Sequence, residues 1–148
     1  MRTMTEWVDL AEAEGFPQRD GATDADLTHI SGAFSRLFGI PMPTDYVDLL
    51  TITNGFDFDG VLIFGTHDQD DADGFLPGVL DSNERLIHGV ESVDTPLRFV
   101  GEAGDLLLAR DTTASTWVAV SRLGWTTRPE LTFRSFSDLF NATMSTTV

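Results

Sequence analysis

The densest group of side chains that could do chemistry lies in one short stretch, HDQDDADG, at residues 67–74. It contains the aspartates Asp68, Asp70, Asp71 and Asp73, with a histidine in front and a glycine behind. Carboxylate oxygens are the ligands that Ca²⁺ and Mg²⁺ prefer, and a histidine beside carboxylates can bind zinc or act as a general base. The stretch is therefore a candidate metal loop, half of an active site, or an acidic surface turn.

The spacing of these aspartates does not match an EF-hand calcium loop. Such a loop needs oxygen ligands at positions 1, 3 and 5, a glycine at 6 and a glutamate at 12. Starting at Asp68 places Ala72 at position 5 and Val79 at position 12. Starting at Asp71 places Phe75 at position 5. Because the register fails in both frames, we expect no metal site, although a cation could relieve the repulsion among the carboxylates adventitiously.

A zinc site is equally poorly supported by the histidines of the chain. Zinc needs three or four convergent ligands, and the chain has three histidines and no cysteine. His29 falls on the polar side of a predicted helix, His88 ends another, and nothing in the spacing brings them to His67. We expect three surface histidines, with His67 hydrogen-bonded at most to a neighbouring aspartate.

Other catalytic motifs are absent or weak. The chain has no G-x-S-x-G nucleophile motif and no phosphate-binding loop. Asp57 and Asp59 alternate onto one side of a predicted strand, as a glycosidase pair could, but strand alternation produces this spacing by chance. We therefore predict a protein that is not an enzyme, with no catalytic residues, no cofactor and no small-molecule substrate.

The charge of the chain is its most unusual property. Nine arginines, no lysine and 24 acidic residues give a formal net charge of −15 over 148 residues. Residues 57–94 alone hold ten acids and one arginine, whereas residues 95–148 hold five of each. Such a surface repels nucleic acid and anionic lipid and speeds encounter with a basic protein. We expect a protein partner, and no nucleic acid or membrane.

The location follows from what the N-terminus and the composition lack. No apolar run approaches the roughly 20 residues of a membrane span, and the first 15 residues have no apolar core of a secretory signal. The absence of cysteine excludes disulfides. We expect a cytoplasmic protein.

Periodicity and end signals predict the elements that position these residues. Three helices come first, from Thr3 to about Gly15, from Thr23 or Asp24 to Gly39, and over residues 44–54. A hairpin with an Asp59-Gly60 turn, a helix at residues 80–88 and strands near 97–101, 105–110, 115–123 and 130–136 follow. A last helix begins after Ser135 or Ser137, and the tail STTV is expected to fray.

This order favours an α+β fold. Helices lead, strands cluster in the middle and one helix closes the chain, so the strands are mostly adjacent in sequence. We predict one domain over residues 1–148 with a helical part at 1–37. Its central sheet is mostly antiparallel and is flanked by the N-terminal helices and the C-terminal helix.

One aromatic residue falls outside the predicted buried stripes. Trp125 lies in RLGWTTRPE, between two predicted strands. It either covers a sheet edge or stands exposed as an anchor of the kind that interfaces favour, and covering is the better-supported role.

Several segments in order resemble one protein family. They are MPTDYVDLLTITNG running into FDFDGVLIFG, then VLDSNERL, RFVGEAGDLLLARD, a strand bearing TW, and FRSFSDLF before the last helix. This set, over residues 38–144, resembles the SUKH superfamily, the bacterial relatives of the Smi/Knr-type yeast cell-wall-assembly regulator, and is most similar to its YrhA-like branch. The acidic insert at residues 68–73 departs from that pattern.

The resemblance implies a non-catalytic role on a sheet flanked by helices. Bacterial members of that superfamily are similar to immunity proteins, which neutralise a cognate toxin domain, in many cases a nuclease with a basic surface. An intracellular regulatory or scaffold module with a housekeeping partner is the alternative. The residues expected to contact the partner are Asp57, Asp59, Asp68, Asp70, Asp71, Asp73 and Trp125.

Overall fold

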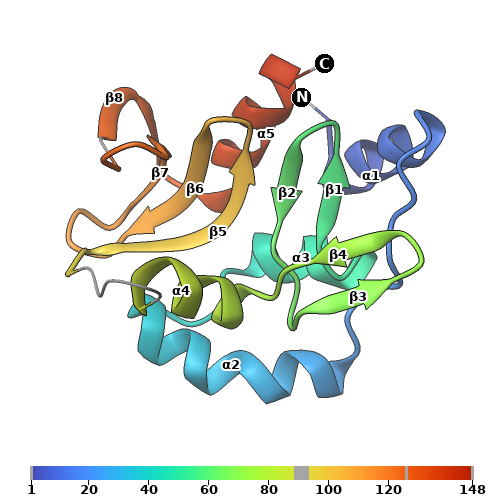
Figure 1. The fold of residues 1–148 in the computed structure, drawn as a ribbon, viewed down its shortest axis with the longest axis horizontal. Coiled ribbons are helices and arrows are strands. Elements are labelled where there is room, and N and C mark those ends of the chain that lie inside the picture. Colours follow the sequence, from blue (N-terminus) through green and yellow to red (C-terminus); the bar gives the residue numbers. More distant parts are fainter. Residues whose placement is uncertain (1, 89–93, 126, 148) are drawn as a thin grey trace.

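The computed structural model describes residues 2–88, 94–125 and 127–147 of the chain (Figure 1). The helices are α1 (Met4–Ala13), α2 (Asp24–Phe38), α3 (Thr44–Ile52), α4 (Val79–His88) and α5 (Phe136–Thr147). The strands are β1 (Phe56–Phe58), β2 (Val61–Ile63), β3 (Gln69–Asp71), β4 (Gly74–Leu76), β5 (Leu97–Ala103), β6 (Leu106–Asp111), β7 (Thr116–Ser121) and β8 (Thr127–Phe133).

Six of the strands form one antiparallel sheet in the order β1-β2-β5-β6-β7-β8. Strands β3 and β4 form a separate two-stranded sheet. Neighbours in the large sheet follow one another along the chain, except that β3, β4 and α4 lie between β2 and β5. The predicted α+β class with a central antiparallel sheet is confirmed.

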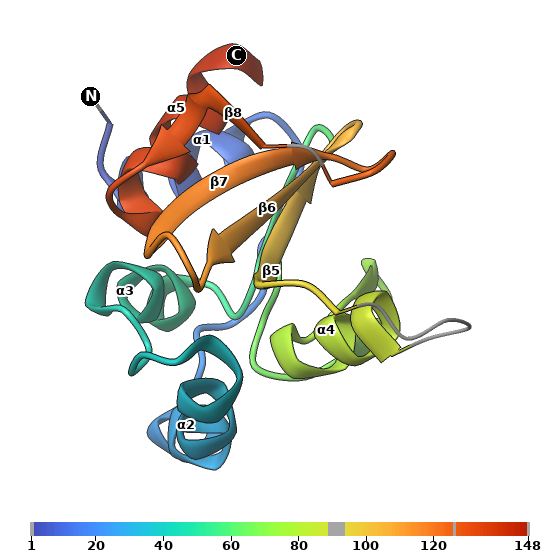
Figure 2. The ribbon, with the colours of Figure 1, turned by 90° about the vertical axis from the view of Figure 1, so that its left-hand side faces the viewer.

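Helices cover both faces of the large sheet (Figure 2). Helix α5 packs on β2, β7 and β8, and α4 packs on β5 from the other side. Trp117 of β7 meets Phe136 of α5 edge to face, with ring centroids 5.9 Å apart. Side chains on both faces of β7 are buried over residues 117–120. This follows from the helices that cover both faces of the sheet.

The helices begin at the residue types that favour helix starts. The Thr23 hydroxyl accepts a hydrogen bond from the Asp26 amide, and the Asp26 carboxylate accepts one from the Thr23 amide, so the two form a capping box. Ser135 caps α5 by accepting from the Asp138 amide at 3.1 Å. Within the described part of the chain, no helix is long and apolar enough to span a membrane.

The predicted Asp59-Gly60 turn between β1 and β2 is confirmed. Asp59 and Gly60 have φ angles of 46° and 87°, as the two central residues of a tight hairpin turn require. Asp59 therefore lies in the turn, and Asp57 lies within β1. The two carboxylates do not alternate along one strand, so the spacing that a glycosidase pair could have used does not arise.

Two further segments are more ordered than predicted. The acidic stretch is not a plain surface turn, because Gln69–Asp71 and Gly74–Leu76 pair as a hairpin. At the C-terminus, α5 continues to Thr147 instead of fraying at residue 145. Met144 is fully buried in the core and fixes the last turns of the helix.

Tyr46, the only tyrosine, connects α3 to the sheet from inside the core. Its ring is fully buried and packs on Phe34 and Phe136. Its hydroxyl donates to the Phe64 carbonyl at 2.6 Å. Only the neutral phenol can make this hydrogen bond, because a phenolate has no proton to donate. Burial raises the pKa of Tyr46 well above the ordinary tyrosine value.

We predict that Tyr46 will not ionise while the protein is folded. Because the folded pKa lies above the unfolded one, its contribution to stability is complete below about pH 10 and is lost as pH rises further. An alkaline titration followed by tyrosinate absorbance and by circular dichroism checks this. Ionisation should coincide with unfolding. A tyrosinate signal that rises near pH 10 in a folded protein would contradict the assignment.

Candidate functional site

The hairpin β3–β4, residues 69–76, is fixed to the body at its neck. Gly65 and Gly78 form a parallel bridge there, the Gly65 amide donates to the Pro77 carbonyl at 3.0 Å, and the Val79 amide donates to the Gly65 carbonyl at 2.8 Å. A Cβ on Gly78 would overlap the backbone of His67, so only glycine allows this close approach. The direction in which the hairpin leaves the body is therefore set by backbone contacts.

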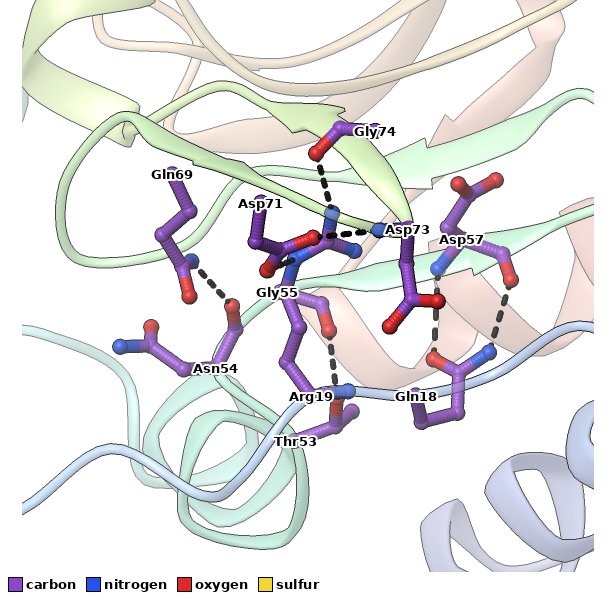
Figure 3. Close-up of polar contacts among 10 residues, drawn as sticks. All are labelled: Gln18, Arg19, Thr53, Asn54, Gly55, Asp57, Gln69, Asp71, Asp73 and Gly74. Atoms are coloured by element: carbon purple, nitrogen blue, oxygen red, sulfur yellow. Dashed lines mark hydrogen bonds and ion pairs between the residues drawn. The ribbon is translucent and has the colours of Figure 1, made fainter.

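The two faces of this hairpin have different roles. Gln69 and Asp71, two residues apart on β3, turn toward the body, as the close-up shows (Figure 3). The side-chain amide of Gln69 donates to the Asn54 backbone carbonyl at 2.7 Å. Asp70 and Phe75 are directly paired across the hairpin, and both are exposed. One face therefore attaches the hairpin, and the other presents a carboxylate beside an aromatic ring.

Arg19 holds the hairpin from below (Figure 3). Its side chain is only 6% exposed, its Nη2 donates to the Gly74 carbonyl at 3.0 Å, and its Nε lies 3.4 Å from an Asp71 carboxylate oxygen. The Nε contact is an ion pair without hydrogen-bond alignment. The Arg19 amide donates to the Thr53 hydroxyl, which in turn donates to the Gly55 carbonyl. One arginine thus joins the N-terminal loop, the end of α3 and the hairpin.

The preceding residue, Gln18, protects the free edge of the large sheet. Its side-chain amide donates to the Asp57 carbonyl at 2.8 Å and accepts from the Asp57 amide at 3.4 Å (Figure 3). These are the two bonds that a neighbouring strand would make to β1. The edge is therefore closed to pairing with another chain at this position.

A chain of polar contacts runs behind the hairpin to His67. The buried Asn54 side chain donates to the Thr66 hydroxyl and accepts from the Thr66 amide, both at 2.8 Å. The Thr66 hydroxyl lies 2.9 Å from Nδ1 of His67. The ring is therefore bonded to a threonine, and not to a neighbouring aspartate as proposed from the sequence.

Between the hairpin, the N-terminal loop and the start of α2 lies a pocket of about 430 Å³, here called the acidic pocket. Its charged lining consists of one guanidinium, that of Arg19, and the carboxylates of Asp20, Asp26, Asp71 and Asp73, with His67 at the side. Hydrogen bonds from Thr23 lower the pKa of Asp26. The pocket therefore presents an excess of negative charge at neutral pH, which suits an ammonium or guanidinium group.

Asp68 faces away from this pocket, toward α4. Its carboxylate accepts two hydrogen bonds from the Arg85 guanidinium, at 2.9 and 3.1 Å, and one from the Gly78 amide. These contacts lower the pKa of Asp68, the Arg85 bond most strongly. The side chains are 34% and 50% exposed, so the pair adds little stability. Asp68 therefore contacts Arg85 and the neck of the hairpin, with about a third of its side chain exposed.

The structure separates the residues that the sequence proposed as one contact surface. Asp71 and Asp73 line the acidic pocket, and Asp70 lies on the outer face of the same hairpin. Asp59 lies in a turn at the other end of β1 and borders a different cavity. Trp125 is partly buried with its ring 5.1 Å from that of Phe99, which favours the covering role.

Sequence reasoning missed three charged residues of this site. Arg19, Asp20 and Asp26 belong to a turn and a helix start that carried only capping and turn signals. The one visible signal is an arginine isolated in an acid-rich segment. That signal does not identify the contact with Gly74, which lies 55 residues further along the chain. Their convergence is a property of the tertiary fold.

The carboxylates and histidines of this region do not form a metal site. Within residues 2–88, 94–125 and 127–147, no three histidine or carboxylate side chains converge closely enough to hold a metal ion. His29, His67 and His88 are exposed on separate segments of the chain.

Comparison of the sequence with protein-family models and with curated proteins finds no match.

We predict that Arg19→Met loosens the hairpin. The substitution leaves the Gly74 carbonyl and the half-exposed Asp71 carboxylate without their cation, and we expect a loss of about 1–2 kcal/mol in the free energy of unfolding. Urea unfolding and amide exchange of residues 69–76 measure the two effects. Arg128→Met is the control, because that arginine is 67% exposed in a weak pair. Equal losses in both variants would contradict the role of Arg19.

Proposed function

We propose that this chain is a non-catalytic protein-binding module, an immunity protein that neutralises a cognate bacterial toxin with a basic surface. The observation that carries the proposal is the hairpin at residues 69–76. It presents Asp70 and Asp73 to solvent above a pocket that already holds an excess of carboxylates. No catalytic step is needed for this role, because occluding a basic site is sufficient.

The electrostatics of the hairpin suit a cationic partner. One arginine, Arg19, lies among the four carboxylates of the acidic pocket, and it is buried beneath the hairpin. An incoming lysine or arginine would replace water around carboxylates that are already held in position. Such complementarity raises the association rate and disfavours partners of the wrong charge.

The surface is also preorganised and has an apolar anchor. The glycine neck and Arg19 fix the hairpin before any partner arrives, which lowers the entropy cost of binding. Phe75 is 53% exposed on the outer face, opposite Asp70. An aromatic side chain ringed by charge is a common centre of binding energy in protein interfaces.

The toxin as partner is supported by the sequence resemblance to the SUKH superfamily described above. The α+β class expected of that superfamily is also the class of this chain, in which three helices, two hairpins, a helix, a run of antiparallel strands and a last helix follow one another. The regulatory or scaffold alternative uses the same acidic surface with a housekeeping protein. A pull-down with the product of the adjacent gene separates them, because only an immunity protein captures a toxin encoded beside it.

We predict that association with the captured partner is steered by the hairpin. Raising ionic strength from about 0.01 M to 1 M shortens the screening length from about 30 Å to 3 Å, so the association rate should fall steeply. The variant Asp70→Asn with Asp73→Asn should associate on the order of tenfold more slowly at low salt. Stopped-flow or biosensor kinetics measure both effects.

The matched control is Asp59→Asn with Glu130→Gln, which removes two acids at the other cavity of the molecule. Asparagine tolerates the left-handed backbone of residue 59. Equal slowing in the two double variants would show that net charge alone matters. A rate independent of both salt and the hairpin acids would refute the proposed surface.

A further inference from the structure

A second cavity lies at the other end of the large sheet, away from the hairpin. Figure 1 shows the β1–β2 turn, the β5–β6 turn and α5 at the same end of the molecule. Residues from these elements and from β7 and β8 enclose about 480 Å³. Its lining is mostly apolar and includes Leu106, Ala119, Leu131, Phe133 and Leu139. This volume lies within the range of small-molecule sites in proteins.

An irregularity in strand β8 makes room for this cavity. Val118 and Val120 of β7 are two residues apart, yet their partners Thr132 and Thr127 are five apart, so β8 carries three extra residues. The Thr132 hydroxyl closes the bulge by donating to the Arg128 carbonyl at 3.0 Å. Bulges re-aim side chains and occur beside functional sites. Leu131 and Glu130 of this irregular segment line the cavity, as does Ala119 of β7.

The polar side chains that line the cavity are hydrogen-bond acceptors. Asp59 and Glu130 contribute carboxylates. The hydroxyls of Thr143, Thr146 and Thr147 on α5 all donate to carbonyls of their own helix, so only their oxygen lone pairs remain for a ligand.

Two arginines close to this lining already have partners. Arg128 is 3.9 Å from Glu130, and both side chains are about two-thirds exposed, which leaves that pair weak. Arg122 donates to the Gly104 carbonyl at 3.0 Å, and its charge is paired with Glu102 at 2.6 Å.

We propose that this cavity binds a small cationic amphiphile, an alkyl or aryl amine. Its apolar body lies between α5 and β7, and its ammonium group donates to the carboxylates of Asp59 and Glu130. Apolar walls with two carboxylates in the lining select against an anion of the same length, because its head group would meet two like charges. The site is separate from the acidic pocket, so this inference stands or falls independently of the proposed toxin partner.

Decylammonium and decanoate, which share their chain length and differ in charge, are the probes. Calorimetry gives the affinity, and methyl resonances of Leu106, Leu131 and Leu139 in NMR spectra give the location. We expect saturable binding of decylammonium with shifts at these methyls, and decanoate at least about tenfold weaker. Equal affinities, or shifts spread over the acidic surface without saturation, would overturn the proposal.

Two variants test the apolar wall and the rim separately. Ala142→Leu fills the cavity from α5, and Asp59→Asn with Glu130→Gln removes the negative charge of the lining. Each variant should lower the affinity for decylammonium about tenfold. Asp70→Asn with Asp73→Asn makes the same change in net charge at the hairpin and should leave the affinity unchanged. Thermal unfolding verifies that each variant is folded. If the Asp70→Asn, Asp73→Asn variant lost as much affinity for decylammonium as the Asp59→Asn, Glu130→Gln variant, the binding would depend on general surface charge. That result would refute the site.

Discussion

The geometry of the acidic surface depends on one buried guanidinium. Arg19 contacts the Gly74 carbonyl and the Asp71 carboxylate, and its amide reaches Thr53 at the end of α3. A two-stranded hairpin of three residues per strand is not stable by itself in water. Arg19 and the glycine neck supply the missing contacts. A chain with a charge of −15 can therefore hold carboxylates close together at a defined place.

The elements could be predicted from the sequence because their signals are local. A helix cap at Thr23, an Asp59-Gly60 hairpin turn and the alternation around Trp117 each involve residues within a few positions of one another. The hairpin at residues 69–76 escaped prediction because Asp and Gly disfavour strands, and its pairing is stabilised by contacts from outside it. In this hairpin, contacts with the rest of the fold outweigh the low strand propensity of its residues.

The candidate site was only partly predictable for the same reason. Composition indicated an acidic surface, and Asp71 and Asp73 do meet in the acidic pocket. Arg19, however, is separated from Gly74 by 55 residues, and no periodicity relates them. Asp59 was grouped with these acids by sequence distance alone. It lies instead on the rim of an apolar cavity, where the same carboxylate chemistry points to a different class of ligand.

We propose that the hairpin and the acidic pocket form the partner surface, and hydrogen–deuterium exchange can test this proposal. Exchange is measured for the free chain and for its complex with the product of the adjacent gene. We expect slower exchange of amides in residues 69–76 and in the loop at residues 18–23, with little change around β8. Protection confined to β8 and α5, with the hairpin amides unchanged on binding, would contradict it.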